Sequence, residues 1–244
     1  MKIFKILNLF LRLAVILVII EQFRLQNYES AILAVITLIV FIFPVFIKKK
    51  IEIPDIIESM LLIAIYASVI LGEIKLYYVI FPHWDSIVHI LDGFILAAIG
   101  YSLINFINKG HKLSMILSPA FTVLYIICFA VTMGVIWELF EFFGDSVFGK
   151  DMQKDVYINQ INSILLNQDN INIPAKISID SVVINGKEWQ GYVDIGLIDT
   201  MKDMLLNLVG AVFFAVYSYF RIKRSGANVL EDLLLEKNEK TKKT

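Results

Sequence analysis

The sequence predicts an all-α polytopic membrane protein with six transmembrane helices and a small extracytoplasmic α+β insertion between the fifth and the sixth. The chain of 244 residues is 58% hydrophobic and has a mean hydropathy of +0.72, which is more apolar surface than a soluble domain of this length needs. Six apolar runs each approach the ~20 residues that cross ~30 Å of hydrocarbon. A long polar stretch separates the last two runs.

The apolar runs cover residues 3–23, 31–47, 56–72, 86–107, 119–143 and about 200–220. The first follows lysines as a signal peptide would, but no small-residue cleavage site comes after it, so we expect a retained helix. Arg12 interrupts this run near its start, and we expect its side chain to snorkel toward the membrane surface. The fifth run is longer than a span and should tilt or project beyond the bilayer. Ser118-Pro119 is suited to begin it.

Lysine and arginine residues in the short loops predict the orientation of the chain. They gather at the N-terminus, between runs two and three, between runs four and five, and after run six: Lys2, Lys5, Lys48, Lys49, Lys50, Lys109, Lys112, Arg221, Lys223 and Arg224. The alternate short loops carry only Arg24 and Lys75. Because cytoplasmic loops carry the excess of positive charge, we expect both termini to lie in the cytoplasm.

The predicted organisation has four parts: helices one to five at 1–144, an extracytoplasmic cap at 145–198, helix six at 199–222, and a charged cytoplasmic tail at 223–244. Asn185-Gly186 between β-prone residues predicts one β-hairpin in the cap. The earlier part of the cap, residues 150–172, is expected to form a short helix and a loop. In the tail, leucines at 230, 233 and 234 indicate a short surface helix, and we expect the remainder to be disordered.

Three sets of polar side chains lie at the ends of runs that this orientation places near the outer face. Each set has a spacing that puts its members on one helical face: Asp85, His89 and Asp92; Glu138, Glu141 and Asp145; Asp199, Asp203 and Asn207. A carboxylate at membrane depth costs roughly 2.5–3.5 kcal/mol on insertion scales, so such residues are candidates for function. Gly93, Gly134 and Gly210 continue these faces inward and favour close helix packing. We therefore expect runs four to six to bring the three sets together.

Several carboxylates cannot lie close together and all stay ionised unless a cation or shared protons neutralise them. A divalent metal ion of unknown identity is one solution, and its candidate ligands are His89, Glu138, Glu141 and Asp203. Mixed imidazole and carboxylate ligands suit Zn, Mn or Fe, whereas all-oxygen ligands suit Mg or Ca. A protonated network is the alternative. The supporting polar residues are expected to be Asp85, Asp92, Asp145, Asp199 and Asn207.

Three functions are compatible with these groups, and the sequence names no substrate. The first is a metal-dependent enzyme at the outer leaflet that acts on an envelope or lipid-linked substrate, with Glu141 as the candidate base. The second is a non-catalytic scaffold or sensor with a structural cation site, and the third is an ion-coupled transporter. No Gly-x-Ser-x-Gly or His-Glu-x-x-His motif is present, and the single cysteine, Cys128, excludes an internal disulfide. The net charge of -1 gives no case for nucleic acid, so the expected partner is the lipid bilayer, and the oligomeric state is open.

Three motifs carry a resemblance to a known family: Asp85-x-x-x-His89-x-x-Asp92-Gly93, Trp137-Glu138-x-x-Glu141, and Asp199-Thr200-x-x-Asp203-Met204 followed by Gly210. Over these motifs, from Asp85 to about Phe220, the chain resembles the YjdF-like uncharacterised bacterial inner-membrane proteins. More distantly, it is similar to VanZ-like envelope proteins. The resemblance implies a multi-pass protein of the bacterial cytoplasmic membrane and carries no activity over. The polar segment before Asp199 is longer than this resemblance leads us to expect.

Overall fold

The computed structural model describes residues 2–48, 51–110, 117–169, 171–225, 233, 236 and 237. The chain forms two compact units, residues 1–134 with 205–244, and residues 135–204. The first unit contains most of the apolar helical residues, and the second contains the strand insertion. Two long helices run from one unit into the other.

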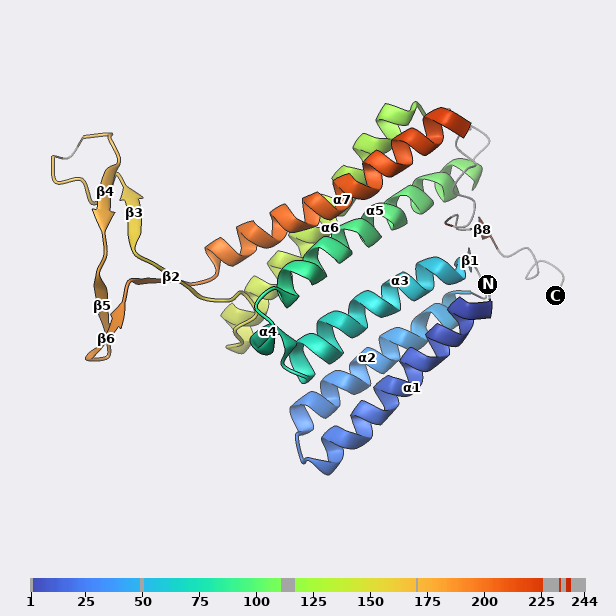
Figure 1. Ribbon diagram of the computed structural model, residues 1–244, viewed down its shortest axis with the longest axis horizontal. Helices are drawn as coiled ribbons and strands as arrows, with labels where there is room; N and C mark the ends of the chain where they lie inside the picture. The colour runs from blue at the N-terminus through green and yellow to red at the C-terminus, as the bar shows by residue number, and fades with distance from the viewer. Residues whose placement is uncertain are drawn as a thin grey trace. The chain divides into compact units, whose positions relative to one another are not determined.

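In the part of the chain that the structure describes, six helices are long and apolar enough to cross a membrane, which confirms the predicted fold class (Figure 1). They are α1 (Lys2–Arg24), α2 (Tyr28–Ile47), α3 (Asp55–Ile65) with its continuation η1 (Tyr66–Ile74), α5 (Trp84–Gly110), α6 (Pro119–Phe148) and α7 (Leu197–Ser225). The hydroxyl oxygen of Ser118 accepts a hydrogen bond from the backbone N–H of Phe121 at 3.2 Å, so it caps α6 as the sequence predicts.

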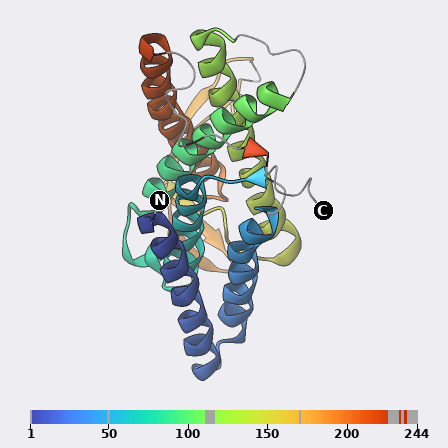
Figure 2. The same cartoon turned by 90° about the vertical axis from the view of Figure 1, so that its right-hand side faces the viewer.

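The hydrophobic core of the first unit has two parts, and α3 contributes to both. In one part, α1 and α2 pack against Leu62 of α3 and Ile70 of η1. In the other, Ile57 of α3 packs with Tyr101 of α5, Ile126 of α6 and Phe214 of α7. Figure 1 and Figure 2 show α1 and α2 as neighbouring antiparallel helices. The third span therefore connects the α1–α2 pair to the helices that carry most of the predicted polar groups.

The third span changes from an α-helix to a π-helix at Tyr66, which the sequence does not predict. The π-helix ends where the backbone N–H of Lys75 donates to the carbonyl oxygen of Ile70 at 3.0 Å. Leu76 then adopts a left-handed conformation with φ of 60°, and the short helix α4 (Tyr77–Ile80) follows. Both features are uncommon, since π-helices are rare and residues other than glycine seldom have a positive φ.

Two hydrogen bonds hold α4 and the start of α5 against η1. The hydroxyls of Tyr78 and Ser68 lie 3.1 Å apart, and the indole nitrogen of Trp84 donates to the backbone oxygen of Ala67 at 3.1 Å. Gly72 leaves room for the Tyr78 ring, because a Cβ at this position would lie 2.3 Å from a ring carbon. The π-helix therefore fixes the first turn of α5, where Asp85 lies.

Arg12 pairs with groups of two other helices, which the sequence does not predict. Its guanidinium donates to the backbone oxygen of Phe41, and its Nη2 lies 2.5 Å from Oε1 of Glu58. Lys48 pairs with Glu58 as well, and with Asp55 at 3.1 Å. Glu58 is 3% exposed and needs such partners, because burying an unpaired charge is costly. The spacing of residues along α1 alone cannot reveal a partner on α3.

The insertion in the second unit is a branched set of antiparallel strand pairs. The pairs are β2 (Val156–Ile158) with β7 (Tyr192–Asp194), β3 (Gln160–Ser163) with β4 (Ala175–Ser178), and β5 (Ser181–Ile184) with β6 (Lys187–Gln190). Figure 1 shows the β3–β4 and β5–β6 hairpins leaving the β2–β7 pair in different directions.

The turn of the β5–β6 hairpin is the one that the sequence predicts. Asn185 and Gly186 have φ of 50° and 78°, the positive values that a tight two-residue turn requires. The short helix expected within residues 150–172 does not form in the described part of this segment. β2 and β3 occupy it instead, because they pair with strands that are distant in the sequence.

In the tail, β8 (Glu236–Lys237) pairs with β1 (Ile51–Glu52). The expectation of disorder is therefore wrong for Glu236 and Lys237. Of the leucines expected to form a surface helix, Leu233 is buried against the core, and Leu230 and Leu234 lie outside the described residues.

Candidate metal centre

The first turns of α5 carry a histidine and an aspartate that contact each other. His89 Nε2 lies 3.4 Å from Oδ1 of Asp85, one helical turn earlier. His89 is 7% exposed, whereas Asp85 and Asp92 are half-buried. The spacing of these residues places all three on one face of α5, as the sequence predicts.

Glycines allow α5 and α7 to reach backbone contact one turn further along each helix. A Cβ on Gly93 would lie 1.9 Å from the carbonyl oxygen of Asn207, and a Cβ on Gly210 would lie 2.0 Å from that of Ile90. Any larger residue at either position would push the two helices apart. Because an α-helix has 3.6 residues per turn, the turn before Gly93 carries His89 and the turn before Asn207 carries Asp203.

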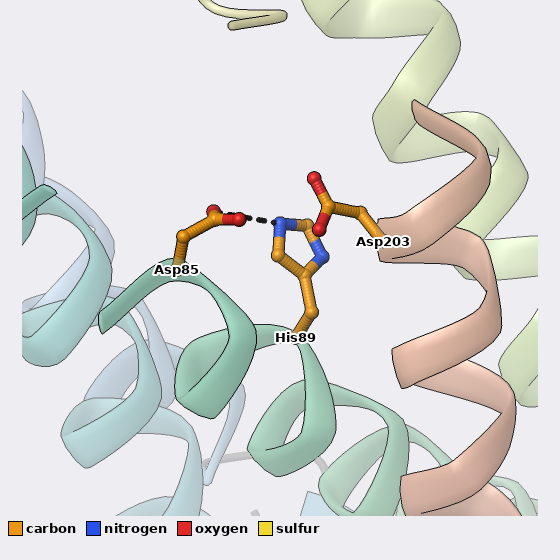
Figure 3. A group of neighbouring side chains, drawn as sticks. All are labelled: Asp85, His89 and Asp203. Atoms are coloured by element: carbon orange, nitrogen blue, oxygen red, sulfur yellow. Dashed lines mark ion pairs between the residues drawn. The ribbon is translucent and has the colours of Figure 1, made fainter. Parts of the chain in front are cut away.

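Asp85, His89 and Asp203 form a group whose side chains could hold a metal ion. One ligand atom from each residue lies within 4.8 Å of the other two. Figure 3 shows the side chains of Asp85 and His89 from α5 and of Asp203 from α7 pointing toward one another. Asp203 is 1% exposed. Two carboxylates and an imidazole at these separations supply the charge and the donor atoms that a divalent cation requires.

The glutamates of α6, which the sequence predicts as further ligands, are buried in the structure. Glu138 is 5% exposed and Glu141 is 9% exposed. Oε1 of Glu141 accepts a hydrogen bond from the indole nitrogen of Trp137 at 2.8 Å, one turn earlier in the same helix. The group of three ligand residues found in the described part of the chain includes neither glutamate. Their role as ligands, and that of Glu141 as a base, therefore stay predictions.

Asp145 and Asp199, expected as supporting residues, both bind the backbone of the segment that follows α6. Asp145 accepts hydrogen bonds from the N–H groups of Met152 and Gln153 at 2.6 and 2.9 Å. Asp199 accepts one from the N–H of Lys154 at 2.8 Å. These bonds fix a loop and give both carboxylates a structural function.

Asn207, the last of the supporting residues, is 4% exposed on α7. Its amide lies against Gly134 of α6, where a Cβ would be 3.1 Å from Oδ1. Gly134 therefore leaves the space in which this side chain lies.

Sequence reasoning misses Tyr78, whose hydroxyl is held by Ser68 close to the start of α5. Burial raises the pKa of Tyr78 above its ordinary value; the Ser68 hydrogen bond opposes this, and the nearby carboxylates of Asp85, Glu73 and Asp92 raise it further. The phenol is therefore protonated at physiological pH and is able to donate a hydrogen bond. No sequence pattern points to this residue, because its position depends on the π-helix.

Comparison with known families agrees with the six apolar helices. Residues 5–224 match a family of predicted membrane proteins. The chain belongs to the DUF2238 family. The matched range of this DUF2238 protein includes Asp85, His89 and Asp203. Neither the curated proteins nor the solved structures contain a match to it.

Proposed function

We propose that this DUF2238 protein is a metal-dependent enzyme at the outer face of the membrane. It binds a divalent cation through Asp85, His89 and Asp203. The observation that carries the proposal is the approach of the three ligand atoms to within 4.8 Å of one another. Buried carboxylates in an apolar helical bundle are costly unless they are neutralised. A bound cation would neutralise these carboxylates and would also provide a site at which a reaction can take place.

The donor set favours a borderline metal ion. One imidazole and two carboxylates suit Zn, Mn or Fe better than Mg or Ca, which prefer oxygen ligands alone. Such an ion acts as a Lewis acid and lowers the pKa of a bound water molecule. In this proposal Glu141 or Glu138 of α6 serves as the base, and the substrate is an envelope or lipid-linked molecule that reaches the site from the outer leaflet.

The orientation belongs to the same proposal. The lysine-rich loops favour a bacterial cytoplasmic membrane protein with both termini inside, as the YjdF-like resemblance also implies. Asp85, at the start of α5, then lies near the outer surface. The ligands gather at one end of the spans, which disfavours an ion-coupled transporter, because such proteins bind their ions near the middle of the bilayer.

A non-catalytic protein with a structural cation is the second candidate, and one observation favours it. Lys202 Nζ lies 3.6 Å from Oδ1 of Asp203, so a cationic side chain already offsets part of the negative charge. In this candidate the ion would join α5 to α7 and take no part in a reaction. Removal of the metal would then lower the thermal stability, and substitution of Glu141 would leave metal binding unchanged.

Metal content tests the proposal. The full-length protein, purified in detergent without chelators, is analysed for transition metals and then titrated with Mn²⁺ and Zn²⁺. We expect about one ion per chain, and a loss of at least tenfold in affinity for Asp203→Asn and for His89→Gln. Asp180→Asn, an exposed aspartate of the insertion, is the matched control and should bind normally. Absence of binding by the wild-type protein would refute the proposal.

A further inference from the structure

The strongest unexplained group in the first unit is the side-chain oxygen of Asn207. Oδ1 of Asn207 is fully buried and has no hydrogen-bond partner among the described residues. A buried amide oxygen without a partner lowers the stability of the folded state, so such groups are rare in folded proteins. An acceptor that remains unsatisfied in an apolar helical bundle indicates that a donor or a cation completes it.

The surroundings of Asn207 are built to admit its amide. Gly134 of α6 allows it to lie there, since a Cβ at this position would be 3.0 Å from Cγ of Asn207. Gly93 of α5 contacts the Asn207 backbone from the other side. Gly134 therefore leaves space for the polar side chain, and Gly93 lets the backbone that carries it approach α5.

Asn207 also lies close to Asp203 along α7. It follows Asp203 by four residues, so the two side chains occupy the same helical face one turn apart, about 6 Å along the helix axis. Its backbone contact with Gly93 aligns it with the turn of α5 that follows His89. The unsatisfied oxygen thus belongs to the residue one helical turn beyond Asp203, next to the turn of α5 that follows His89.

We propose that Asn207 Oδ1 is a further ligand of the cation bound by Asp85, His89 and Asp203, and that it selects for Mn²⁺ over Zn²⁺. This inference rests on the proposed metal site. Carbonyl oxygens are ligands of hard, six-coordinate cations such as Mn²⁺, whereas Zn²⁺ takes its ligands from Cys, His and carboxylate side chains. The amide therefore adds more to the binding of Mn²⁺ than to that of Zn²⁺.

The test compares three variants of the full-length protein with the wild type, by Mn²⁺ titration followed by electron paramagnetic resonance and by Zn²⁺ competition. Asn207→Leu removes the oxygen but keeps the branched shape of the side chain, and it should weaken Mn²⁺ binding at least tenfold and Zn²⁺ binding less than threefold. Asn207→Asp keeps the oxygen and should bind Mn²⁺ at least as tightly as the wild type. Ser218→Ala is the matched control, since Ser218 Oγ is a buried atom on the same helix that also lacks a hydrogen-bond partner in the described part of the chain.

Thermal unfolding of the metal-free proteins distinguishes a ligand from a packing residue. Asn207→Leu should leave the metal-free protein as stable as the wild type or more stable, because it removes an unsatisfied polar atom. Mn²⁺ affinity within twofold of the wild type in Asn207→Leu would overturn the inference and leave the metal site itself standing. Absence of Mn²⁺ and Zn²⁺ binding by the wild type would overturn both. If Asn207→Leu does not fold, weaker Mn²⁺ binding by Asn207→Asp would overturn the inference.

Discussion

The indole nitrogen of Trp84 donates a hydrogen bond to the backbone oxygen of Ala67 at 3.1 Å. This contact joins the first residue of α5 to the π-helix of the third span. Asp85, the next residue, belongs to the candidate metal centre. The geometry of the π-helix is therefore transmitted to the site through the start of α5.

Replacing Trp84 with Phe should disturb both stability and metal binding. The variant keeps an aromatic ring against Tyr77 but loses the hydrogen bond, which is worth about 1 kcal/mol. We expect a lower thermal midpoint and a several-fold weaker affinity for Mn²⁺. Tyr77→Phe, which changes the neighbouring ring of the same contact, should match the wild type. Unchanged metal affinity in Trp84→Phe would show that the first turn of α5 is held by other contacts.

The close crossing of α5 and α7 leads us to predict a larger effect from a substitution at Gly93. Gly93→Ala places a methyl group where the carbonyl oxygen of Asn207 now lies, so the helices must separate. Overpacking of this kind costs about 1–3 kcal/mol, and here the obstacle is rigid backbone. We expect loss of metal binding together with a lower thermal midpoint.

Gly144→Ala is the control for this substitution, because its new methyl group meets only the flexible end of Met152. It should be well tolerated. If Gly93→Ala binds metal as the wild type does, backbone contact between the two helices is not what positions the ligands.

Much of this arrangement can be predicted from the sequence, for identifiable reasons. The six spans can be predicted because each has the length and hydropathy of a bilayer crossing. The Asn185-Gly186 turn can be predicted because its geometry depends on local sequence. His89 and Asp203 stand out because charge at membrane depth is expensive. The sequence indicates a supporting role for Asp85, and the structure places it among the three ligand-type residues.

The parts that the sequence does not reveal depend on contacts between distant segments. The pairing of Arg12 with Glu58 joins α1 to α3, and Tyr78 reaches Ser68 only because η1 is a π-helix. The strands β2 and β3 form in a segment rich in Asn and Gln because β7 and β4 lie beside them. Tertiary pairing decides each of these cases, and local propensity does not.

The ion pairs around Glu58 predict a large effect from a small substitution. Glu58→Gln keeps the shape of the side chain but leaves Arg12 and Lys48 without their shared negative charge. Removing one member of a buried ion pair typically costs about 3–5 kcal/mol. We expect a strongly reduced thermal midpoint in detergent, and we expect the metal affinity of the molecules that remain folded to be unchanged.

Glu21→Gln is the matched control, because the pair between Glu21 and Lys75 is largely exposed and surface pairs contribute little. An equal loss of stability in both variants would contradict the assignment of Glu58 as a buried structural charge.

The acidic residues of the insertion predict a dependence on pH. Partial burial and the carboxylates of Asp151, Asp194 and Asp145 raise the pKa of Asp155 above its ordinary value. The folded state then binds the proton of Asp155 more tightly than the unfolded state does. Ionised Asp155 therefore opposes folding, and this cost is absent below pH 3.8 and develops as the pH rises through and above that value.

Asp155→Asn should accordingly raise the thermal midpoint at pH 7 by a small amount and should leave it unchanged at pH 3. The gain should shrink in 1 M salt, because the charge is largely exposed and ions screen it. Asp180→Asn serves as the control. A stabilisation that is equal at both pH values would indicate a cause other than charge.

The orientation of the chain can be measured with cysteine labelling, since Cys128 is the single cysteine. Cys128→Ser provides a background into which one cysteine is introduced at a time, either Asp180→Cys in the insertion or Lys242→Cys in the tail. If the lysine-rich loops are cytoplasmic, a membrane-impermeant maleimide should label intact cells of the Asp180→Cys variant, and should label the Lys242→Cys variant only after permeabilisation. The opposite labelling pattern would place the start of α5 at the cytoplasmic face. The candidate metal centre would then meet soluble substrates of the cell interior. An enzyme that acts on the outer leaflet would be ruled out.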